Sequence, residues 1–197
     1  MSDVFSANAQ FPQPLPGKSG WPWDEISEPL PETMPDGEPW PRITVVTPSY
    51  NQDQYLEETI RSVLLQNYPN LEYIVMDGGS TDGSIDIIKK YEPWITYWAS
   101  EIDAGQSAAI NKGFTIGTGE IFSWLNSDDF FSLNMMARAA LYLAHHSDIG
   151  MIYGDLNADG MNIKQNNGRR YFYFFRWQLR YMCGIPQETT FWRADIF

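Results

Sequence analysis

The sequence predicts an α/β protein with a doubly wound, mostly parallel, Rossmann-like sheet and helices on both faces. Two observations support this fold class. From Arg42 onward, short runs rich in β-branched residues alternate with segments whose apolar residues recur at helical spacing. The segments between successive runs are long enough for the crossover helices that parallel strands require. With 197 residues, 43% of them hydrophobic, the chain can bury one sizeable core.

The first 41 residues precede this pattern and form a separate segment. Nine of the thirteen prolines lie there, and they deny the backbone both helix and sheet hydrogen bonds. The segment is therefore expected to be extended, either as a disordered leader or with its second half lying against the core. The indole rings of Trp21, Trp23 and Trp40 favour packing. The division is thus a Pro/Trp-rich segment over 1–41 and one domain over 42–197.

Strands and helices alternate through the domain. Strands are predicted where β-branched and aromatic residues cluster between polar or glycine-containing stretches, over residues 43–47, 71–76, 95–99, 121–125 and 149–153. Apolar residues at intervals of three and four predict helices over 55–64, from Ser84 onward, over 104–116 and over 133–144. Asn51 or Asp53 is the expected N-terminal cap of the first helix.

Polar residues gather immediately after each predicted strand. These clusters are residues 48–52, 77–84, 101–106, 126–129 and 154–155. The carboxyl ends of parallel strands meet at one edge of a sheet, and ligands of open α/β sheets bind outside that edge. The five clusters therefore predict one binding site.

The cluster over residues 77–84 contains three glycines, which allow a flat ligand to approach the backbone closely. Asp77 and Asp82 would then accept hydrogen bonds from a base or a ribose. The alternative is an ordinary turn between strand and helix, with Asp82 or Ser84 acting only as a helix cap. Taken alone, this cluster favours the alternative.

Asp128 and Asp129 are adjacent carboxylates directly after an apolar strand. They repel each other unless a cation or hydrogen bonds compensate. Oxygen ligands of this kind suit Mg²⁺ or Mn²⁺, which commonly combine one or two carboxylates with phosphate oxygens. Such a cation would neutralise a diphosphate leaving group. The alternative is that the pair caps a helix that begins near Ser132.

Composition excludes several classes of function. A formal net charge of −12 disfavours a nucleic-acid partner. No phosphate-binding Gly-x-x-x-x-Gly-Lys-Ser/Thr loop occurs, and Gly117 and Gly119 precede a strand and lack the third glycine of a dinucleotide fingerprint. The single Cys183 cannot form an internal disulfide, which favours the cytoplasm. No apolar run approaches the roughly 18 residues that span a bilayer, so no transmembrane segment is expected.

The polar motifs together resemble glycosyltransferase family 2. They occupy residues 48–52, 77–84, 100–106, 109–113 and 124–129, and the resemblance covers about residues 40–197. It implies a glycosyltransferase A fold, a nucleotide-diphosphate sugar donor that is usually a uridine one, a divalent Mn²⁺ or Mg²⁺ ion, and inversion at the anomeric carbon. The implied acceptor is a saccharide or a lipid-linked molecule. Polysaccharide biosynthesis in the cytoplasm, with peripheral association at the inner face of the membrane, fits such an acceptor.

The resemblance also implies roles for individual residues. Asp128 and Asp129 match the metal motif of the family, and Asp128 also belongs to the expected nucleotide site. The remaining nucleotide-binding residues that it implies are Pro48, Tyr50 and Asn51 at the base, Asp77 at base or ribose, Asp103 near the donor, and Gly78, Gly79, Gln106 and Asn111. Many members carry a second aspartate where this chain has Gly78, so the contact that fixes uracil differs here.

The catalytic base of the family usually lies in an acidic motif well beyond a segment like residues 184–193, and this chain stops at Phe197. The domain is therefore expected to be incomplete at its C-terminus. Glu188 is the available substitute, although a polar residue lining the acceptor groove would look the same. The alternatives to a transferase are a non-catalytic nucleotide-sugar-binding module, and an interaction module built on the N-terminal segment and the aromatic run 171–177.

Overall fold

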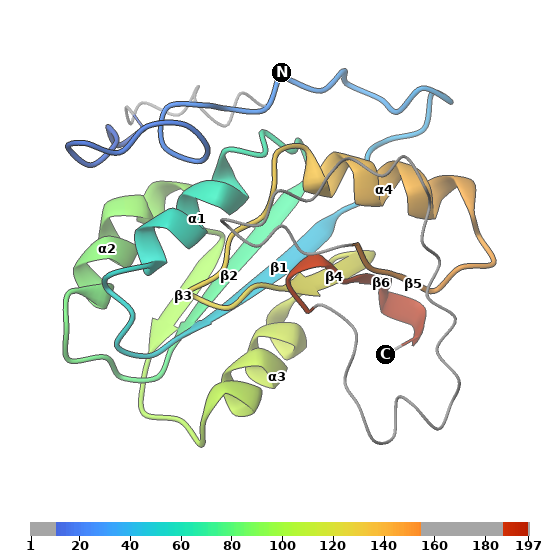
Figure 1. Ribbon diagram of the computed structural model, residues 1–197. Coiled ribbons are helices and arrows are strands. Elements are labelled where there is room, and N and C mark those ends of the chain that lie inside the picture. The colour runs from blue at the N-terminus through green and yellow to red at the C-terminus, as the bar shows by residue number, and fades with distance from the viewer. Residues whose placement is uncertain (1–10, 155–186, 197) are drawn as a thin grey trace.

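A computed structural model describes residues 11–154 and 187–196 of the chain. Six strands form one mixed sheet in the order β3-β2-β1-β4-β6-β5 (Figure 1). The strands are β1 (Ile43–Ser49), β2 (Leu71–Asp77), β3 (Tyr97–Ser100), β4 (Ile121–Trp124), β5 (Met151–Ile152) and β6 (Phe191–Arg193). The α-helices are α1 (Leu56–Leu64), α2 (Ser84–Tyr91), α3 (Gln106–Ile116) and α4 (Met135–His145), and short 3-10 turns are η1 (Glu92–Trp94), η2 (Gln187–Thr189) and η3 (Ala194–Ile196).

The layers are those of a doubly wound α/β protein. Helices α1, α2 and α4 cover one face of the sheet, and α3 covers the other (Figure 1). Strand β1 pairs in parallel with β2 and β4, and β2 pairs in parallel with β3. The chain therefore moves outward from β1 to β3 and then returns to the other side of β1. Ligands of open α/β sheets bind at such a reversal, outside the carboxyl ends of the strands.

Strand β6 is a feature that the sequence did not predict. It lies between β4 and β5 and pairs antiparallel with both. A strand of three residues gives too short a run to show any periodicity. The predicted strand over 149–153 is real but shorter, and the one predicted over 95–99 begins two residues later. The mostly parallel α/β sheet with helices on both faces is confirmed.

Helix α3 packs closely on β1. Ala109 and Gly113 are the buried residues of the helix. A Cβ atom added to Gly113 would lie only 2.5 Å from Cγ1 of Val46, so a larger residue would push the helix away from the sheet. These two small residues therefore let the helix lie close to the sheet.

The predicted cap of α1 is wrong. The N-cap residue is Tyr55, and no side chain caps the helix. The Oδ1 atom of Asn51 instead accepts a hydrogen bond from the Thr81 N–H at 2.9 Å, and Oδ2 of Asp53 accepts one from the Gly83 N–H at 3.1 Å. Both side chains thus join the loop after β1 to the loop after β2.

Residues 11–41 run over the layer formed by α1, α2 and α4 (Figure 1). Trp23 and Trp40 are each only 4% exposed, and Met34 belongs to the main core cluster. The indole of Trp40 donates to the carbonyl of Pro31 at 2.9 Å. The prediction that the second half of this segment packs against the core is confirmed, because Trp23, Met34 and Trp40 are buried.

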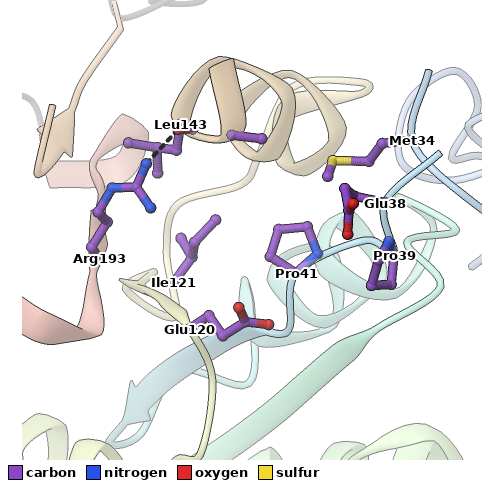
Figure 2. A pocket seen from close by; sticks show the side chains of 9 residues that line it. Met34, Glu38, Pro39, Pro41, Glu120, Ile121, Leu143 and Arg193 are labelled. Carbon is purple, nitrogen blue, oxygen red and sulfur yellow. Dashed lines mark hydrogen bonds between the residues drawn. The ribbon is translucent and has the colours of Figure 1, made fainter. Parts of the chain in front are cut away.

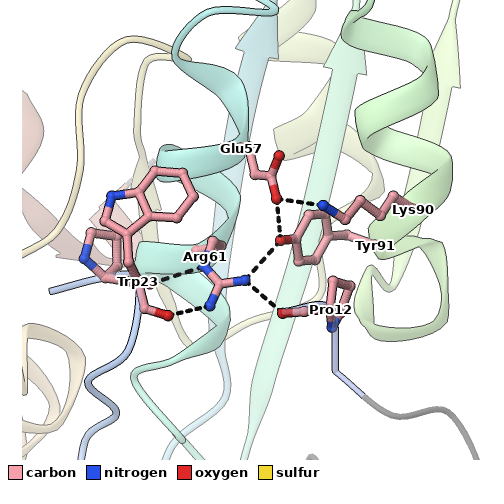
Figure 3. Close-up of polar contacts among 7 residues, drawn as sticks. Pro12, Trp23, Glu57, Arg61, Lys90 and Tyr91 are labelled. Carbon is pink, nitrogen blue, oxygen red and sulfur yellow. Dashed lines mark hydrogen bonds and ion pairs between the residues drawn. The ribbon is translucent and has the colours of Figure 1, made fainter. Parts of the chain in front are cut away.

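Arg61 of α1 fastens this segment to the domain (Figure 3). Its side chain is 2% exposed. The guanidinium donates to three backbone carbonyls, those of Pro22 at 3.0 Å, Pro12 at 2.8 Å and Trp23 at 2.6 Å. It also lies 5.1 Å from the ring centroid of Phe11 and 5.4 Å from that of Trp23. Proline-rich backbone lacks sheet partners for its carbonyls, and here the planar guanidinium supplies the hydrogen-bond donors.

The same guanidinium is linked to a buried carboxylate. Arg61 donates to the Tyr91 hydroxyl at 3.0 Å, and that hydroxyl donates to Oε1 of Glu57 at 2.7 Å. Lys90 forms an ion pair with the same oxygen at 2.7 Å. The chain of contacts in Figure 3 therefore runs from the N-terminal segment through α1 to α2.

A second buried carboxylate lies at the opposite end of the sheet, where Glu72 faces the start of β1 and β4. The Thr44 hydroxyl donates to it at 2.5 Å, and Thr118 donates its N–H at 2.6 Å and its hydroxyl at 2.8 Å. Arg42 pairs with it at 3.2 Å. Burial opposes ionisation, but these hydrogen bonds and the Arg42 charge together lower the pKa of Glu72. Residues 117–119 are thus a structural turn, as the missing fingerprint glycine indicated.

Glu72→Gln should destabilise the protein by about 2 kcal/mol at pH 7, because charge-assisted hydrogen bonds are lost and an amide N–H faces other donors. The carboxylate has a lowered pKa, so its contribution is present above the ordinary value of 4.5 and disappears as pH falls through the folded value. Thermal unfolding of both proteins between neutral and acid pH measures this. A stability gap that stays constant below pH 4.5 would contradict the assignment.

Candidate functional site

The carboxyl edge of the sheet aligns three polar residues in register. Ser49 of β1 pairs with Asp77 of β2, and Asp77 pairs with Ser100 of β3. The Asp77 carboxylate accepts hydrogen bonds from the Ser100 hydroxyl at 2.6 Å and from the N–H groups of Gly79 at 3.1 Å and Ser80 at 2.9 Å. Asp77 is only 2% exposed. It shapes the loop after β2 at this edge, and direct contact with base or ribose stays a prediction.

Asn51, in the loop after β1, also forms hydrogen bonds to the loop after β2. Its backbone adopts a left-handed conformation with φ of 52°. In this position its N–H donates to the Ser80 hydroxyl at 2.8 Å, while its side chain accepts from Thr81. Asp82 accepts from the N–H of Asp53 at 3.0 Å. The first two polar clusters are therefore one hydrogen-bonded unit, which the sequence placed together without predicting its bonds.

Tyr50, Gly78 and Asp103 come together on this unit from three different loops. A Cβ atom at Gly78 would lie 3.3 Å from the Tyr50 ring and 3.4 Å from the Asp103 carboxylate. Gly79 has φ of 83°, and a Cβ atom there would lie only 3.2 Å from Cγ1 of Ile102. Tyr50 is 61% exposed and Ile102 is 91% exposed. The result is a glycine surface between an exposed aromatic ring and a carboxylate.

The loop after β3 leads from this surface to the first turn of α3. The Asp103 carboxylate accepts from the Gly105 N–H at 2.7 Å, and Gly105 has φ of 107°. Gln106 then donates from Nε2 to Oδ1 of Asn126 at 2.7 Å. This hydrogen bond joins the glycine surface to the loop that follows β4.

Asn126 is the centre of a polar cluster, and the sequence placed it in the predicted site without giving it a role. Its Nδ2 donates to Oδ2 of Asp129 at 3.1 Å and to Oε1 of Gln187 at 2.6 Å. Gln187 in turn donates to the carbonyl of Trp124 at 2.7 Å. A hint existed in the sequence, because Asn126 opens the polar run after β4. Nothing in the sequence pattern, however, brings Gln187 to it.

The pKa of the Asp129 carboxyl is raised in this region. Burial is the main cause that raises the pKa of its carboxyl above the ordinary value, and the charges of Glu188 and Asp128 raise it further, while the Asn126 hydrogen bond acts in the opposite direction. The structure therefore brings the candidate base near the predicted metal pair. Glu188 and Asp128 thus lie close enough to Asp129 for their charges to act on its carboxyl.

Backbone contacts to α1 fix the loop that carries the acidic pair. The Thr59 hydroxyl donates to the carbonyl of Asp129 at 2.7 Å, and the Phe131 N–H donates to the Ser62 hydroxyl at 3.1 Å. Helix α4 begins later, with Asn134 as its N-cap and no side-chain cap. The alternative that the acidic pair caps this helix is therefore wrong.

The acidic pair suits a divalent cation that prefers oxygen ligands. Within residues 11–154 and 187–196, no group of three or more His, Cys, Asp or Glu side chains is placed to hold a metal ion. Asp128 and Asp129 would thus supply two ligand side chains, and ligand oxygens and water would complete the shell, as is usual for Mg²⁺ and Mn²⁺.

Pro48 and Asn111 are two further residues of the predicted nucleotide site, and contact with a nucleotide stays a prediction for both. Pro48 is buried within β1, where it pairs with Met76. Asn111 is exposed on α3, and its carbonyl accepts from the Thr115 hydroxyl at 2.8 Å. Gln106, Asp128, Asp129 and Glu188 all lie at the carboxyl edge described above. The aromatic run 171–177, Cys183 and Asp155 lie outside the described residues.

A cavity of about 250 Å³ opens at the other end of the sheet (Figure 2). Its walls come from the N-terminal segment, the starts of β1 and β4, and the end of α4, with Met34, Pro41, Glu120, Leu143 and Arg193 among its lining residues. Arg193 donates there to the carbonyl of Leu143. This cavity lies behind the amino ends of the strands, so it is separate from the polar edge.

The strand order, the polar residues where that order reverses at β1, and the acidic loop after β4 define a glycosyltransferase A fold. The family model described as "Glycosyl transferase family 2" matches residues 44–192, and the chain belongs to this family. The family identity agrees with the resemblance seen in the sequence.

Curated relatives share about a third of the aligned residues. An uncharacterized glycosyltransferase of Mycobacterium tuberculosis (strain H37Rv) is 34% identical over 116 residues, covering 58% of this chain and 44% of the relative. The putative teichuronic acid biosynthesis glycosyltransferase TuaG of Bacillus subtilis is 34% identical over 112 residues, covering 54% and 44%. The chain thus spans less than half the length of both relatives.

Solved structures of similar fold contain nucleotide sugars. The mannosyltransferase PcManGT from Pyrobaculum calidifontis, in complex with GDP-Man and Mn²⁺, is 29% identical with a TM-score of 0.52, covering 56% of this chain and 34% of that one. S. aureus TarS in complex with UDP-GlcNAc is 23% identical with a TM-score of 0.55, covering 63% and 37%, and supports the fold. Among the helices of residues 11–154 and 187–196, none has the length and apolar character of a membrane span.

Proposed function

We propose that the chain binds a nucleotide-diphosphate sugar, with uridine as the base, at the carboxyl edge of β1, β2 and β4. It would be the donor-binding part of an inverting transferase that passes the sugar to a saccharide or lipid-linked acceptor. The observation that carries this proposal is the meeting of Tyr50, Gly78 and Asp103 on one surface. That surface is joined through Gln106 and Asn126 to the acidic loop.

The base would lie on the glycine surface. The exposed tyrosine ring offers a stacking face, and the glycine beside it lets that ring and the Asp103 carboxylate lie close to the backbone. The Asp103 carboxylate then stands at the rim of the same surface, within reach of a polar edge of the base or ribose. Contacts at this position would replace the second aspartate that many family members have instead of Gly78.

The diphosphate would lie toward Asp128 and Asp129. A chain with a net charge of −12 repels a diphosphate, so binding requires a bridging cation. A bound Mn²⁺ or Mg²⁺ supplies charge neutralisation to the departing diphosphate. The role of this chain is to present two carboxylates from a loop that α1 holds in place.

Glu188 is the proposed base of the transfer. Inversion requires a group that takes the proton of the acceptor hydroxyl as it attacks. Glu188 lies in η2, and its charge acts on Asp129, so it would lie close to the proposed cation and donor. The second candidate is a nucleotide-sugar-binding module without catalysis, in which Glu188 is only a polar residue lining the acceptor groove. A donor-turnover assay separates the two, since Glu188→Gln lowers turnover only if this chain is catalytic.

Titration calorimetry with UDP, in the presence of Mn²⁺ and then with a chelator, tests the proposed binding. We expect manganese to raise the UDP affinity by roughly tenfold or more, because the cation offsets the repulsion between the diphosphate and the acidic loop. Magnesium should act in the same direction, and sodium at equal ionic strength should not. Equal UDP affinity with and without the divalent ion would refute the cation site, and no binding in either condition would refute the function.

A further inference from the structure

The acidic loop, residues 126–134, is held by two elements. Helix α1 contacts it through Thr59 and Ser62, as described above. The N-terminal segment contacts it as well. The Trp21 indole N–H donates to the Phe131 carbonyl at 2.6 Å, and the Asn134 N–H donates to the Ser27 hydroxyl at 3.3 Å. Phe131 and Asn134, which form these hydrogen bonds, lie two and five positions after Asp129.

The N-terminal segment is itself fixed, so it can transmit restraint to the loop. Arg61 binds three of its carbonyls, and the Ser27 N–H donates to the Leu65 carbonyl at 3.0 Å. Ser27 is 1% exposed. Residues 11–41 also lie outside the family match, which begins at residue 44. They are therefore an addition to the part of the domain that the family shares.

We propose that residues 11–41 form an N-terminal strap that positions the acidic loop for its cation, with Trp21 and Ser27 as the positioning residues. The proposal rests on the proposed function. Adjacent carboxylates repel each other and Glu188, so a loop that carries them tends to move apart when no cation is bound. Hydrogen bonds from a rigid element reduce the cost of ordering that loop when the ligand arrives. The strap would thus raise the manganese-dependent part of nucleotide affinity without touching the nucleotide.

Trp21→Phe tests the strap, because it keeps an aromatic ring and removes the indole donor. The matched control is Trp40→Phe, which also removes one indole hydrogen bond within the strap but lies away from the acidic loop. Ser27→Ala releases the other end of the loop and provides a second variant. Two measurements are made on each protein: amide hydrogen exchange of residues 126–134, and UDP affinity with and without Mn²⁺.

We expect faster exchange of the acidic loop in Trp21→Phe and Ser27→Ala, and a roughly threefold to tenfold smaller gain in UDP affinity from manganese. The metal-free affinity should stay at the wild-type value. Trp40→Phe should lower the melting temperature while leaving loop exchange and manganese gain unchanged. Wild-type exchange and manganese gain in Trp21→Phe, or equal losses in Trp40→Phe, would overturn the strap. Absence of any manganese gain in the wild-type protein would instead overturn the proposed function.

Discussion

Asp129→Asn is expected to abolish the manganese-dependent gain in UDP affinity and to lower any transfer activity on the order of 100-fold. The amide keeps the shape of the side chain but removes the charge that would bind the cation. The same change relieves the repulsion from Glu188 and Asp128 that raises the pKa of this carboxyl. The variant without ligand should therefore be at least as stable as the wild-type protein while its response to manganese disappears.

Thermal unfolding with saturating UDP and Mn²⁺ measures both effects. At ligand concentrations near 100 times Kd, the wild-type melting temperature should rise by roughly 5–10 °C, and that of Asp129→Asn should rise far less. Asp148→Asn is the charge-matched control, since Asp148 is exposed and precedes β5. A full manganese response in Asp129→Asn would show that the cation, if it binds, is held elsewhere.

Arg61→Met should cost about 3–5 kcal/mol of unfolding free energy, the range expected when one member of a buried charged network is removed. The guanidinium is 2% exposed and satisfies three carbonyls of the N-terminal segment. Its loss leaves those carbonyls without a donor and removes the group that pairs, through Tyr91, with Glu57. The melting temperature should fall by roughly 10 °C.

Urea unfolding of Arg61→Met and of Lys18→Met compares a buried with an exposed loss of positive charge. Lys18 pairs with Glu58 at 3.8 Å and its side chain is 51% exposed, so its removal should change stability by less than about 1 kcal/mol. Arg61→Lys keeps the charge without the planar fork and should fall between the two. A cost for Arg61→Met no larger than for Lys18→Met would contradict the role given to this side chain.

The fold followed from local patterns, and the exceptions have local causes. Alternating β-branched runs and helical spacing located β1, β2, β4 and the four helices to within a few residues. Strand β6 was missed because Phe191–Arg193 is too short to show a period and pairs with strands far from it in sequence. The cap of α1 was misjudged because Asn51 and Asp53 bind the neighbouring loop, a partner that sequence spacing does not reveal.

The site was partly predictable for a topological reason. Parallel strands bring their carboxyl ends to one edge, so Tyr50, Gly78 and Asp103 meet even though each comes from a different loop. Hydrogen bonds to backbone carbonyls were not predictable, because every residue has a carbonyl and no side-chain type marks the one that is used. The bond from Trp21 to Phe131 is of this kind, and the sequence indicated only that the tryptophan would pack.

The amide of Asn126 receives one hydrogen bond from Gln106 and shares its N–H₂ group between Asp129 and Gln187. Both of its donors are thus spent within the protein, which leaves this residue without a free donor for an incoming molecule. Three stretches of the chain, at Gln106, at residues 126–129 and at Gln187, are therefore joined by the hydrogen bonds of this one amide. A displacement of the turn at Gln187 would therefore either break its hydrogen bond to Asn126 or move the amide that donates to the Asp129 carboxylate, which couples the two loops.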